Sequence, residues 1–337
     1  MKNLSIIILL FLFSSCRKEN SVLLPLVEET PIIGQDYPNE LFMSYPLGID
    51  IIGNDLLIFT HKDQHIIKIV DAQNGSETKN VGLRGDGPNE IVQPFYWGFF
   101  DNHIYLYDFG KKKLRKYNWN TTKTEIDFFS VKEISLSEQW DLLAGKIINN
   151  QFFVTNISFG LSKPIVILND QLSLKDNLGE IPDKKHQTKA LFSFSGHLSS
   201  YENRFVFAMA EVGYIAYYEL NPDGTNSLLW DHYLEKPIYK GTGLDRNQLK
   251  LAFSDVKKTK NYIFCSYFGE KLSRENMKTL KPRNLLVFDH KGNLIKNFRS
   301  KRSLGKFTVS EDEKTIYAVT EEPEVAIIRF DISNLLK

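Results

Sequence analysis

The feature that most constrains the fold is a short apolar segment that recurs about every 50 residues along the chain. Each copy is rich in β-branched and aromatic residues, and most copies follow a turn that contains Asn or Asp. Such segments suit the packed, pleated surface of a β-sheet. The six copies are Leu56–Thr60, Ile104–Asp108, Phe152–Asn156, Phe205–Met209, Tyr262–Ser266 and Ile316–Thr320.

A second series of strand-like segments runs in phase with the first. Turn sequences such as Pro222-Asp223-Gly224 often follow its members, as expected for β-hairpins. With a weaker strand before each pair and a polar strand after it, the repeating unit has four antiparallel strands. Six such units predict an all-β fold, a six-bladed β-propeller. The second series comprises Ile66–Asp71, Leu114–Asn118, Ile165–Asp170, Ile215–Asn221, Leu285–Asp289 and Ala326–Asp331.

The last unit is incomplete, because it ends at Asp331-Ile332-Ser333 after three strands. An unassigned apolar run, Val22–Glu28, lies near the N-terminus. We predict that this N-terminal strand completes the last blade, which would protect an exposed sheet edge. Pro25 suits an edge position, where a missing N–H is tolerated. The alternative is a loosely packed lead-in.

The N-terminal residues predict export and lipid anchoring. Lys2 precedes an apolar run, Leu4–Phe13, which is typical of a signal peptide and too short to span a bilayer. Ser14-Ser15-Cys16 resembles a bacterial lipobox, which implies lipidation of Cys16. The predicted organisation is a lipoprotein signal peptide (1–15), a lipidated tether (16–21) and the propeller (22–337). The alternative is an ordinary cleaved signal peptide with a chance cysteine.

Charge and cysteine content limit the possible partners and cofactors. The formal charge of +1 predicts no nucleic-acid partner. After lipidation of Cys16, Cys265 is the one remaining thiol, and its apolar surroundings predict a buried core residue. The seven histidines show no metal-binding spacing, and no serine hydrolase motif is present. We therefore predict no cofactor and no metal site, and assign no catalytic residue.

A glycine-rich segment lies between the first two units. It reads Gly82-x-x-Gly85-x-Gly87-Pro88-x-Glu90, and it resembles the Gly-Pro-x-Glu-Phe segment of TolB-like six-bladed propeller lipoproteins, with Ile91 in place of phenylalanine. Many members of that family have no known function. The resemblance implies a lipid-anchored propeller facing the periplasm or the cell surface. The predicted location is the bacterial outer membrane, with the lipid on Cys16 as the membrane contact.

The long connections between strands are predicted to lie on one face of the propeller, where variable loops on a rigid scaffold often bind ligands. Arg84 is the leading candidate, because a guanidinium can grip a carboxylate or phosphate through two hydrogen bonds. The amides around Gly85 and Gly87 would form an anion-binding nest. Alternatively, the glycines only shape a tight connection and Arg84 pairs with a neighbouring acid. The predicted ligand-binding residues are Arg84, Gly85, Gly87, Tyr45, Gln93, Phe95, Trp140, His61, Asp108 and Glu211, with Phe192 nearby.

Three functions are compatible with this sequence. The first is a lipid-anchored binding or scaffold propeller of the cell envelope, which recognises a small anionic ligand, a glycan or a partner protein through its long-loop face. The second is a propeller hydrolase or lactonase, in which channel carboxylates such as Asp108 and Glu211 would hold a divalent cation. The third is a structural part of an envelope complex that binds no small ligand.

Overall fold

A computed structural model describes residues 22–37, 43–44, 46–119, 128–133, 142–149, 151–156, 163–169, 173–179, 194–241 and 243–336. The predicted signal peptide and tether, with Cys16, lie outside these residues, as do Tyr45, Trp140 and Phe192. Within the described ranges, no helix has the length and apolar character needed to cross a membrane.

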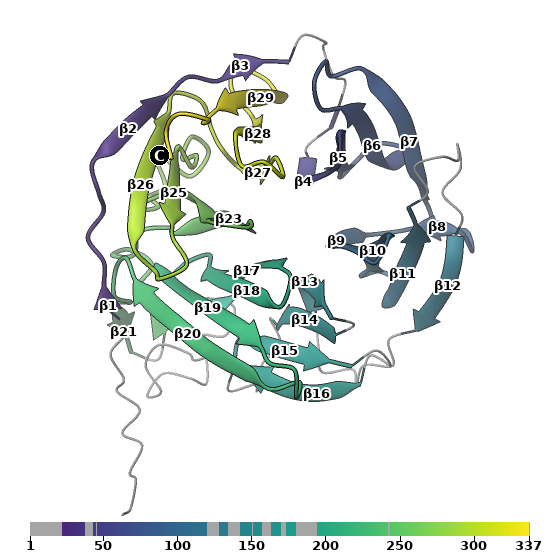
Figure 1. The fold of residues 1–337 in the computed structure, drawn as a ribbon, viewed down its shortest axis with the longest axis horizontal. Helices are drawn as coiled ribbons and strands as arrows, with labels where there is room; N and C mark the ends of the chain where they lie inside the picture. The colour runs from purple at the N-terminus through teal and green to yellow at the C-terminus, as the bar shows by residue number, and fades with distance from the viewer. Residues whose placement is uncertain are drawn as a thin grey trace, which may run out of the picture.

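The described residues form six sheets of four or five strands arranged in a ring (Figure 1). This confirms the predicted all-β, six-bladed propeller. Blade 1 consists of β4 (Pro46–Ile52), β5 (Asp55–Thr60), β6 (His65–Asp71), β7 (Glu77–Arg84) and the short β8 (Glu90–Ile91). Blade 2 consists of β9 (Pro94–Phe100), β10 (His103–Asp108), β11 (Lys113–Asn118) and β12 (Phe128–Glu133). Blade 3 consists of β13 (Leu142–Ile148), β14 (Gln151–Asn156), β15 (Ile165–Leu168) and β16 (Leu174–Leu178).

The second half of the ring repeats this plan. Blade 4 consists of β17 (Gly196–Tyr201), β18 (Arg204–Met209), β19 (Tyr214–Leu220) and β20 (Asn226–Tyr233). Blade 5 consists of β23 (Phe253–Lys258), β24 (Ile263–Tyr267), β25 (Asn284–Phe288) and β26 (Leu294–Ser300). Blade 6 consists of β27 (Lys306–Val309), β28 (Thr315–Thr320) and β29 (Ala326–Asp331). In each blade the first strand lies closest to the ring axis (Figure 1).

Backbone geometry explains the tight turns between first and second strands. Tight two-residue hairpins need residues with positive φ, because this twist matches that of the flanking strands. The turns contain such residues even where no glycine is present, as at Asn102 (φ 57°), Glu202 (φ 54°) and Glu313 (φ 58°). The predicted turns therefore lie where the Asn- and Asp-rich sequences placed them.

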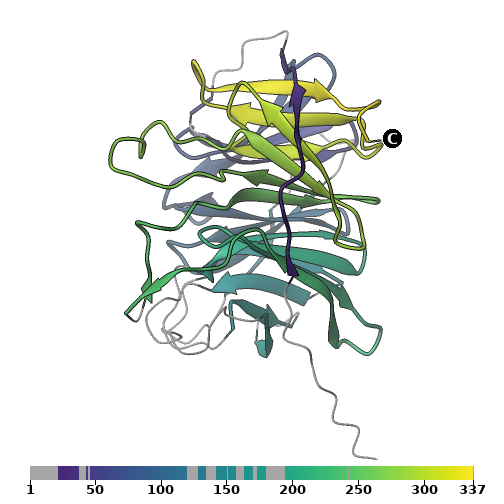
Figure 2. The same ribbon diagram turned by 90° about the vertical axis from the view of Figure 1, so that its left-hand side faces the viewer.

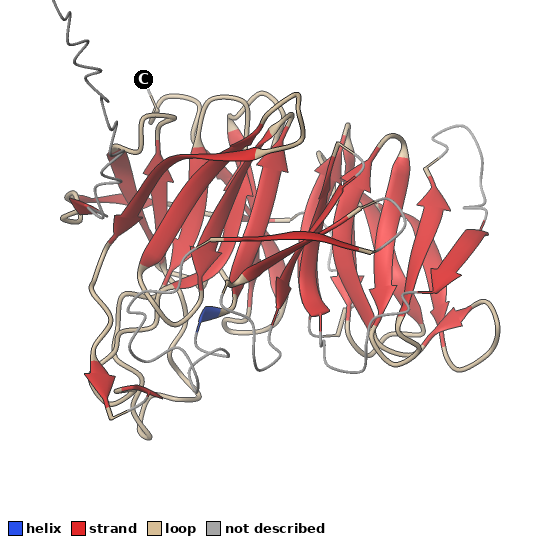
Figure 3. Cartoon of the chain, turned by 90° about the horizontal axis from the view of Figure 1, so that it is seen from below, coloured by secondary structure: helices blue, strands red, loops and turns tan. Residues whose placement is uncertain are grey.

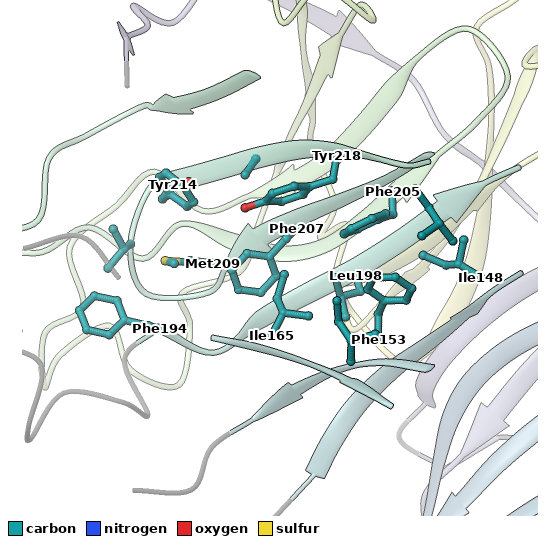
Figure 4. Packing of buried hydrophobic residues seen from close by; sticks show 14 residues of the cluster. Ile148, Phe153, Ile165, Phe194, Leu198, Phe205, Phe207, Met209, Tyr214 and Tyr218 are labelled. Carbon is teal, nitrogen blue, oxygen red and sulfur yellow. The ribbon is translucent and has the colours of Figure 1, made fainter. Parts of the chain in front are cut away.

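The hydrophobic core is divided into layers between neighbouring blades. Between blades 3 and 4, Phe153 and Ile165 pack against Phe205 and Phe207 (Figure 4). The rings of Phe153 and Phe205 lie 4.6 Å apart, centre to centre. Middle strands bury both faces, which explains their nearly continuous apolar sequences. Cys265 is fully buried in blade 5, as predicted, and burial raises the pKa of its thiol.

The N-terminal segment crosses the outer edges of three successive blades (Figures 1 and 2). We call residues 22–36 the N-terminal strap. Its β1 (Val22–Leu23) runs parallel to β20 of blade 4, and its β2 (Glu29–Ile32) runs parallel to β26 of blade 5. Its β3 (Gln35–Asp36) pairs antiparallel with β29 and supplies the fourth strand of blade 6.

An N-terminal strand thus completes the last blade as predicted, but the assignment of that strand to Val22–Glu28 was wrong. The apolar side chains of Leu24 and Val27 pack on the core between blades 4 and 5. The completing strand, Gln35–Asp36, is polar and exposed, as an outermost strand can be. The apolar run Val22–Glu28 is therefore the part of the strap that covers the core between blades 4 and 5, and the polar Gln35–Asp36 is the part that closes the ring.

The long described connections lie on the face opposite the tight turns, which we call the long-loop face. The connection from blade 4 to blade 5 carries a small hairpin, β21 (Tyr239–Lys240) and β22 (Gly243–Leu244), which projects from this face (Figure 3). The loop between β24 and β25 lies on the same face. The connections from blade 2 to blade 3 and from blade 3 to blade 4 extend beyond the described residues, whereas the connection between blades 1 and 2 lies within them.

Candidate functional site

The glycine-rich loop between blades 1 and 2 binds a carboxylate of its own chain. Oε2 of Glu90 accepts a hydrogen bond from the amide of Gly87 at 2.8 Å. The amide of Gly85 donates to the carbonyl of Ile91 at 3.1 Å. Gly85 has a φ of 158°, and a Cβ atom there would overlap the Glu90 carboxylate. The spacing of glycines and glutamate in this motif is therefore explained by the loop's own closure.

Arg84 also makes its contacts within the fold. Its guanidinium donates to the carbonyl oxygens of Thr60 (Nη2, 3.0 Å), Asp63 (Nε, 3.3 Å) and Val92 (Nη1, 3.3 Å). Burial lowers the pKa of Arg84, and nearby Asp63 opposes that shift. Arg84 thus joins the loop after β5 to the connection that leads into blade 2.

We predict that Arg84→Ala lowers the free energy of unfolding by about 2 kcal/mol, because three backbone carbonyls lose a charged donor. Urea unfolding of the purified domain would measure the change. Arg274→Ala, at an exposed loop position, is the matched control and should leave the unfolding midpoint unchanged. An unaltered midpoint for Arg84→Ala would show that the three carbonyl contacts add no net stability.

The other described candidates lie at separate places. Asp108 is fully buried and accepts hydrogen bonds from the amides of Val92 and Gln93, both at 3.2 Å. Glu211 forms a bidentate ion pair with Arg246, whose Nε and Nη2 donate to Oε2 and Oε1 of Glu211 at 3.1 and 3.0 Å. His61 and the side chain of Gln93 are exposed. Among the described candidates, Phe95 alone borders the channel cavities described next.

Two cavities lie along the ring axis, and the innermost strands line them. One, of about 250 Å³, is lined by strand beginnings near the long-loop face, and the other, of about 440 Å³, reaches the tight-turn face. Lys146 and Lys257 border both. We call six of the titratable side chains that line these cavities from the innermost strands the channel cluster: Asp50 (β4), Lys146 (β13), His197 (β17), Asp255 and Lys257 (β23) and Lys306 (β27). Tyr96, Tyr201 and Lys258 line the same cavities from these strands.

The two carboxylates of the channel cluster already have partners. Asp50 accepts a hydrogen bond from the hydroxyl of Tyr96 at 2.6 Å and lies 3.9 Å from Nζ of Lys257. Burial alone would raise the pKa of Asp50, but Lys257, Lys146 and Tyr96 bring it below its usual value. Burial likewise opposes ionisation of Asp255, whose pKa is lowered by Lys306, Lys257 and His197. Both groups are therefore ionised at neutral pH.

Lys146 differs from the other two lysines of the cluster. Lys257 donates to the carbonyl of Ile49 at 3.1 Å, and Lys306 donates to that of Ser254 at 2.9 Å. Nζ of Lys146 instead lies over the ring of Tyr96, 4.9 Å from its centre, and has no hydrogen-bond or ion-pair partner among the described residues. Burial, reinforced by Lys257, lowers the pKa of Lys146 to about 8, although Asp50 and Asp255 oppose the shift.

Local irregularities in blade 2 make room for this lysine. The pairing of β9 with β10 shifts by one residue, which leaves Trp97 as a β-bulge, and Gly98 follows with a φ of 128°. Nζ of Lys146 lies 3.5 Å from the point where a Cβ of Gly98 would be. The ring of Trp97 packs directly against Gly145, where a Cβ would lie 2.7 Å away. Gly145 thus lets the ring of Trp97 pack against β13, and Lys146, the next residue, lies beside Gly98 and over Tyr96.

None of the channel cluster is among the predicted ligand-binding residues, because the predicted site lay in the long loops. The sequence does contain a pattern that indicates the cluster, since charged residues interrupt the apolar first strands at inward positions. The clearest examples are Ile49-Asp50-Ile51, Gly145-Lys146-Ile147 and Asp255-Val256-Lys257. In the described part of the chain, no group of three or more His, Cys, Asp and Glu side chains is arranged to hold a metal ion.

Comparisons with known proteins agree with this architecture. An exported protein of Bacteroides fragilis has a similar structure, with a TM-score of 0.60 and 12% identity, over 89% of this chain and 94% of that one. Regucalcin of Agrobacterium tumefaciens, described as calcium-binding, aligns with a TM-score of 0.53 and 10% identity, over 91% of this chain and 95% of its own. At such low identity these likenesses concern the fold alone. No curated protein matches. The family profile described as TolB-like 6-blade propeller-like matches residues 32–312, so the chain belongs to that family.

Proposed function

We propose that this protein is an exported binding propeller whose channel holds a small organic anion. The observation that carries the proposal is Lys146, which is half-buried, borders both cavities and has no hydrogen-bond or ion-pair partner for its ammonium group among the described residues. A buried charge is costly unless an opposite charge meets it. A bound anion would supply that charge, with Lys257 as the second cation in reach of both cavities.

The size and lining of the cavities support a small ligand. The cavity near the long-loop face has a volume of about 250 Å³, which is just below the range of about 300–1,000 Å³ for small-molecule sites. Apolar side chains such as Leu47, Phe59 and Phe95 line much of it, whereas the charges lie on the innermost strands. A carboxylate or phosphate ester with a compact apolar body would match both parts.

We place this activity in the cell envelope. The apolar run Leu4–Phe13 and the lipobox-like Ser14-Ser15-Cys16 support export and a lipid anchor on Cys16, with the outer membrane as the expected site. The similar exported protein of Bacteroides fragilis is compatible with this location. The hydrolase alternative gains no support, because the two channel carboxylates are each paired with lysines or hydrogen-bond donors.

A calorimetric titration tests the proposal. The probes are inorganic phosphate, succinate and a hexose phosphate, each at pH 7 and pH 9.5. We expect at least one probe to bind, and to bind about tenfold more weakly at pH 9.5, because Lys146 loses its proton as the pH rises through about 8. Lys146→Met should weaken binding at pH 7 by about tenfold, as loss of the same charge does at pH 9.5, whereas Lys291→Met, at an exposed hairpin turn, should not.

Three outcomes would contradict the proposal. One is binding that Lys146→Met leaves intact, because the anion would then lie elsewhere on the protein. The second is binding that does not change between pH 7 and pH 9.5. The third is failure of every probe to bind the wild-type protein.

A further inference from the structure

We propose that Lys146 is an amine nucleophile that forms an imine with a small anion carrying an aldehyde or ketone, such as a 2-oxo acid. This inference rests on the proposed function, because the anion must first enter the channel. It goes further by naming the chemical class of the ligand and a covalent bond to one side chain. The structure provides three separate reasons.

The first reason is access. Lys146 lines both cavities. The ammonium groups of the other lysines on the innermost strands that line the cavities, Lys257, Lys258 and Lys306, are held by the backbone carbonyls of Ile49, Thr259 and Ser254. Among the described lysines on the innermost strands, Lys146 is therefore the one that a carbonyl compound in the channel meets without a hydrogen-bond partner.

The second reason is the protonation state. Only the neutral amine is a nucleophile, and desolvation or a neighbouring cation favours the neutral form of a lysine. Both effects act on Lys146, which is buried and close to Lys257. With a pKa of about 8, Lys146 has about 300-fold more neutral amine at pH 7 than an ordinary lysine.

The third reason is that Lys146 and Lys257 would have complementary roles. The ammonium group of Lys257 has three N–H donors and gives one of them to Ile49, so it can also pair with the carboxylate of a 2-oxo acid while Lys146 reacts with the carbonyl group. The ring of Tyr96, whose hydroxyl donates to Asp50, lies under the same Lys146 ammonium group. Burial and Asp50 raise the pKa of Tyr96, so that hydroxyl keeps its proton.

The reaction needs no oxidant or metal. The lone pair of the neutral Nζ attacks the carbonyl carbon, and one N–H proton of the amine is transferred to the carbonyl oxygen, which gives a carbinolamine. That intermediate loses its hydroxyl group together with the second N–H proton as water, and a carbon–nitrogen double bond forms. The net change is amine plus carbonyl to imine plus water.

Reductive trapping tests this inference. The purified protein is mixed with glyoxylate, borohydride is added, and the modified lysines are identified by peptide mass spectrometry. We expect the adduct at Lys146 to exceed that at any surface lysine by about tenfold or more. Its initial rate should rise from pH 6 to pH 8, as neutral amine accumulates. Glycolate, an anion of similar shape without the carbonyl, should compete.

Matched variants make the outcomes distinguishable. Lys146→Met should remove the dominant adduct, and Lys291→Met should keep it. If glyoxylate and glycolate bind the channel but no adduct forms at Lys146, the imine is excluded while the anion site stands. Adducts spread evenly over surface lysines would also overturn the inference. If neither compound binds, the inference and the proposed function fail together.

Discussion

Lys146→Met is expected to raise the free energy of unfolding at pH 7 by about 3 kcal/mol. The lysine is charged at this pH in both the folded and the unfolded chain, but burial and Lys257 make the charged form unfavourable in the folded chain. Methionine has a similar length and no charge, so it should fill the same space beside Gly98 without the penalty. Urea unfolding of the two proteins at pH 7 measures the difference.

The pH dependence provides an independent check on the same group. Between the folded pKa of about 8 and the unfolded value of 10.5, the unfolded chain binds more protons, so wild-type stability should rise with pH. Lys146→Met should lack this rise, and Lys291→Met should retain it. A variant that is less stable than the wild type at pH 7 would show that the ammonium group is well solvated or paired, which would remove the main support for the anion site.

Acidification is expected to destabilise the protein through His197, by at most about 5 kcal/mol between pH 6.5 and pH 3. Burial, followed by Lys306, lowers the pKa of His197 to about 3, while Asp255 opposes the shift and Lys257 adds to it. In this pH range the unfolded chain binds a proton that the folded chain does not. Stability is therefore fully present above pH 6.5 and is lost as the pH falls towards 3.

Unfolding midpoints measured at intervals from pH 7 to pH 4 test this prediction. His197→Asn should flatten the loss of stability over this range, and His61→Asn, at an exposed position, should not change it. The range stops at pH 4 because Asp50 and Asp255, whose pKa values are also lowered, contribute to acid unfolding below it. Equal slopes for wild type and His197→Asn would exclude His197 as the cause.

Both predictions follow from the burial of titratable side chains in the channel. Lys146 and His197 both border the cavity near the long-loop face, and both are titratable groups whose charged forms are disfavoured there. A site that binds anions must keep a cation away from water. Because desolvation of that cation is unfavourable, it lowers the stability of the folded protein. A variant that is more stable and binds no anion would show this trade-off directly.

The fold could be predicted from the sequence because the strand and turn patterns are local and repeated. The predicted segment Ile104–Asp108 lies within β10, and Phe205–Met209 lies within β18. Alternation, β-branching and turn residues act over a few positions, so one sequence is enough to read them. Six repeats of the same signal then determined the number of blades.

The candidate site could not be predicted from the sequence, because it depends on residues far apart in the chain. Lys146, Lys257 and Tyr96 come from three blades, and they meet because each occupies an inward position of a strand. At Arg84 the sequence pattern predicted a ligand site, and the structure shows contacts within the protein. A glycine-rich loop with an arginine is typical of an anion site, yet the Arg84 guanidinium and the loop amides bind groups of the same chain. Whether Arg84 or the loop contacts a ligand stays a prediction.

The N-terminal strap has a consequence for the order of events during folding. Arg329 donates a hydrogen bond to Gln35 across 294 positions of the chain. The segment synthesised early thus finds its partners only when blades 4, 5 and 6 exist, and bringing such distant parts together is slow and entropically costly. A nascent or partly exported chain cannot lock its ring, and the sheet edges of its last blades stay open. Folding of this protein is therefore completed by residues 22–36, which fasten blades 4, 5 and 6 in place after the rest of the ring has formed.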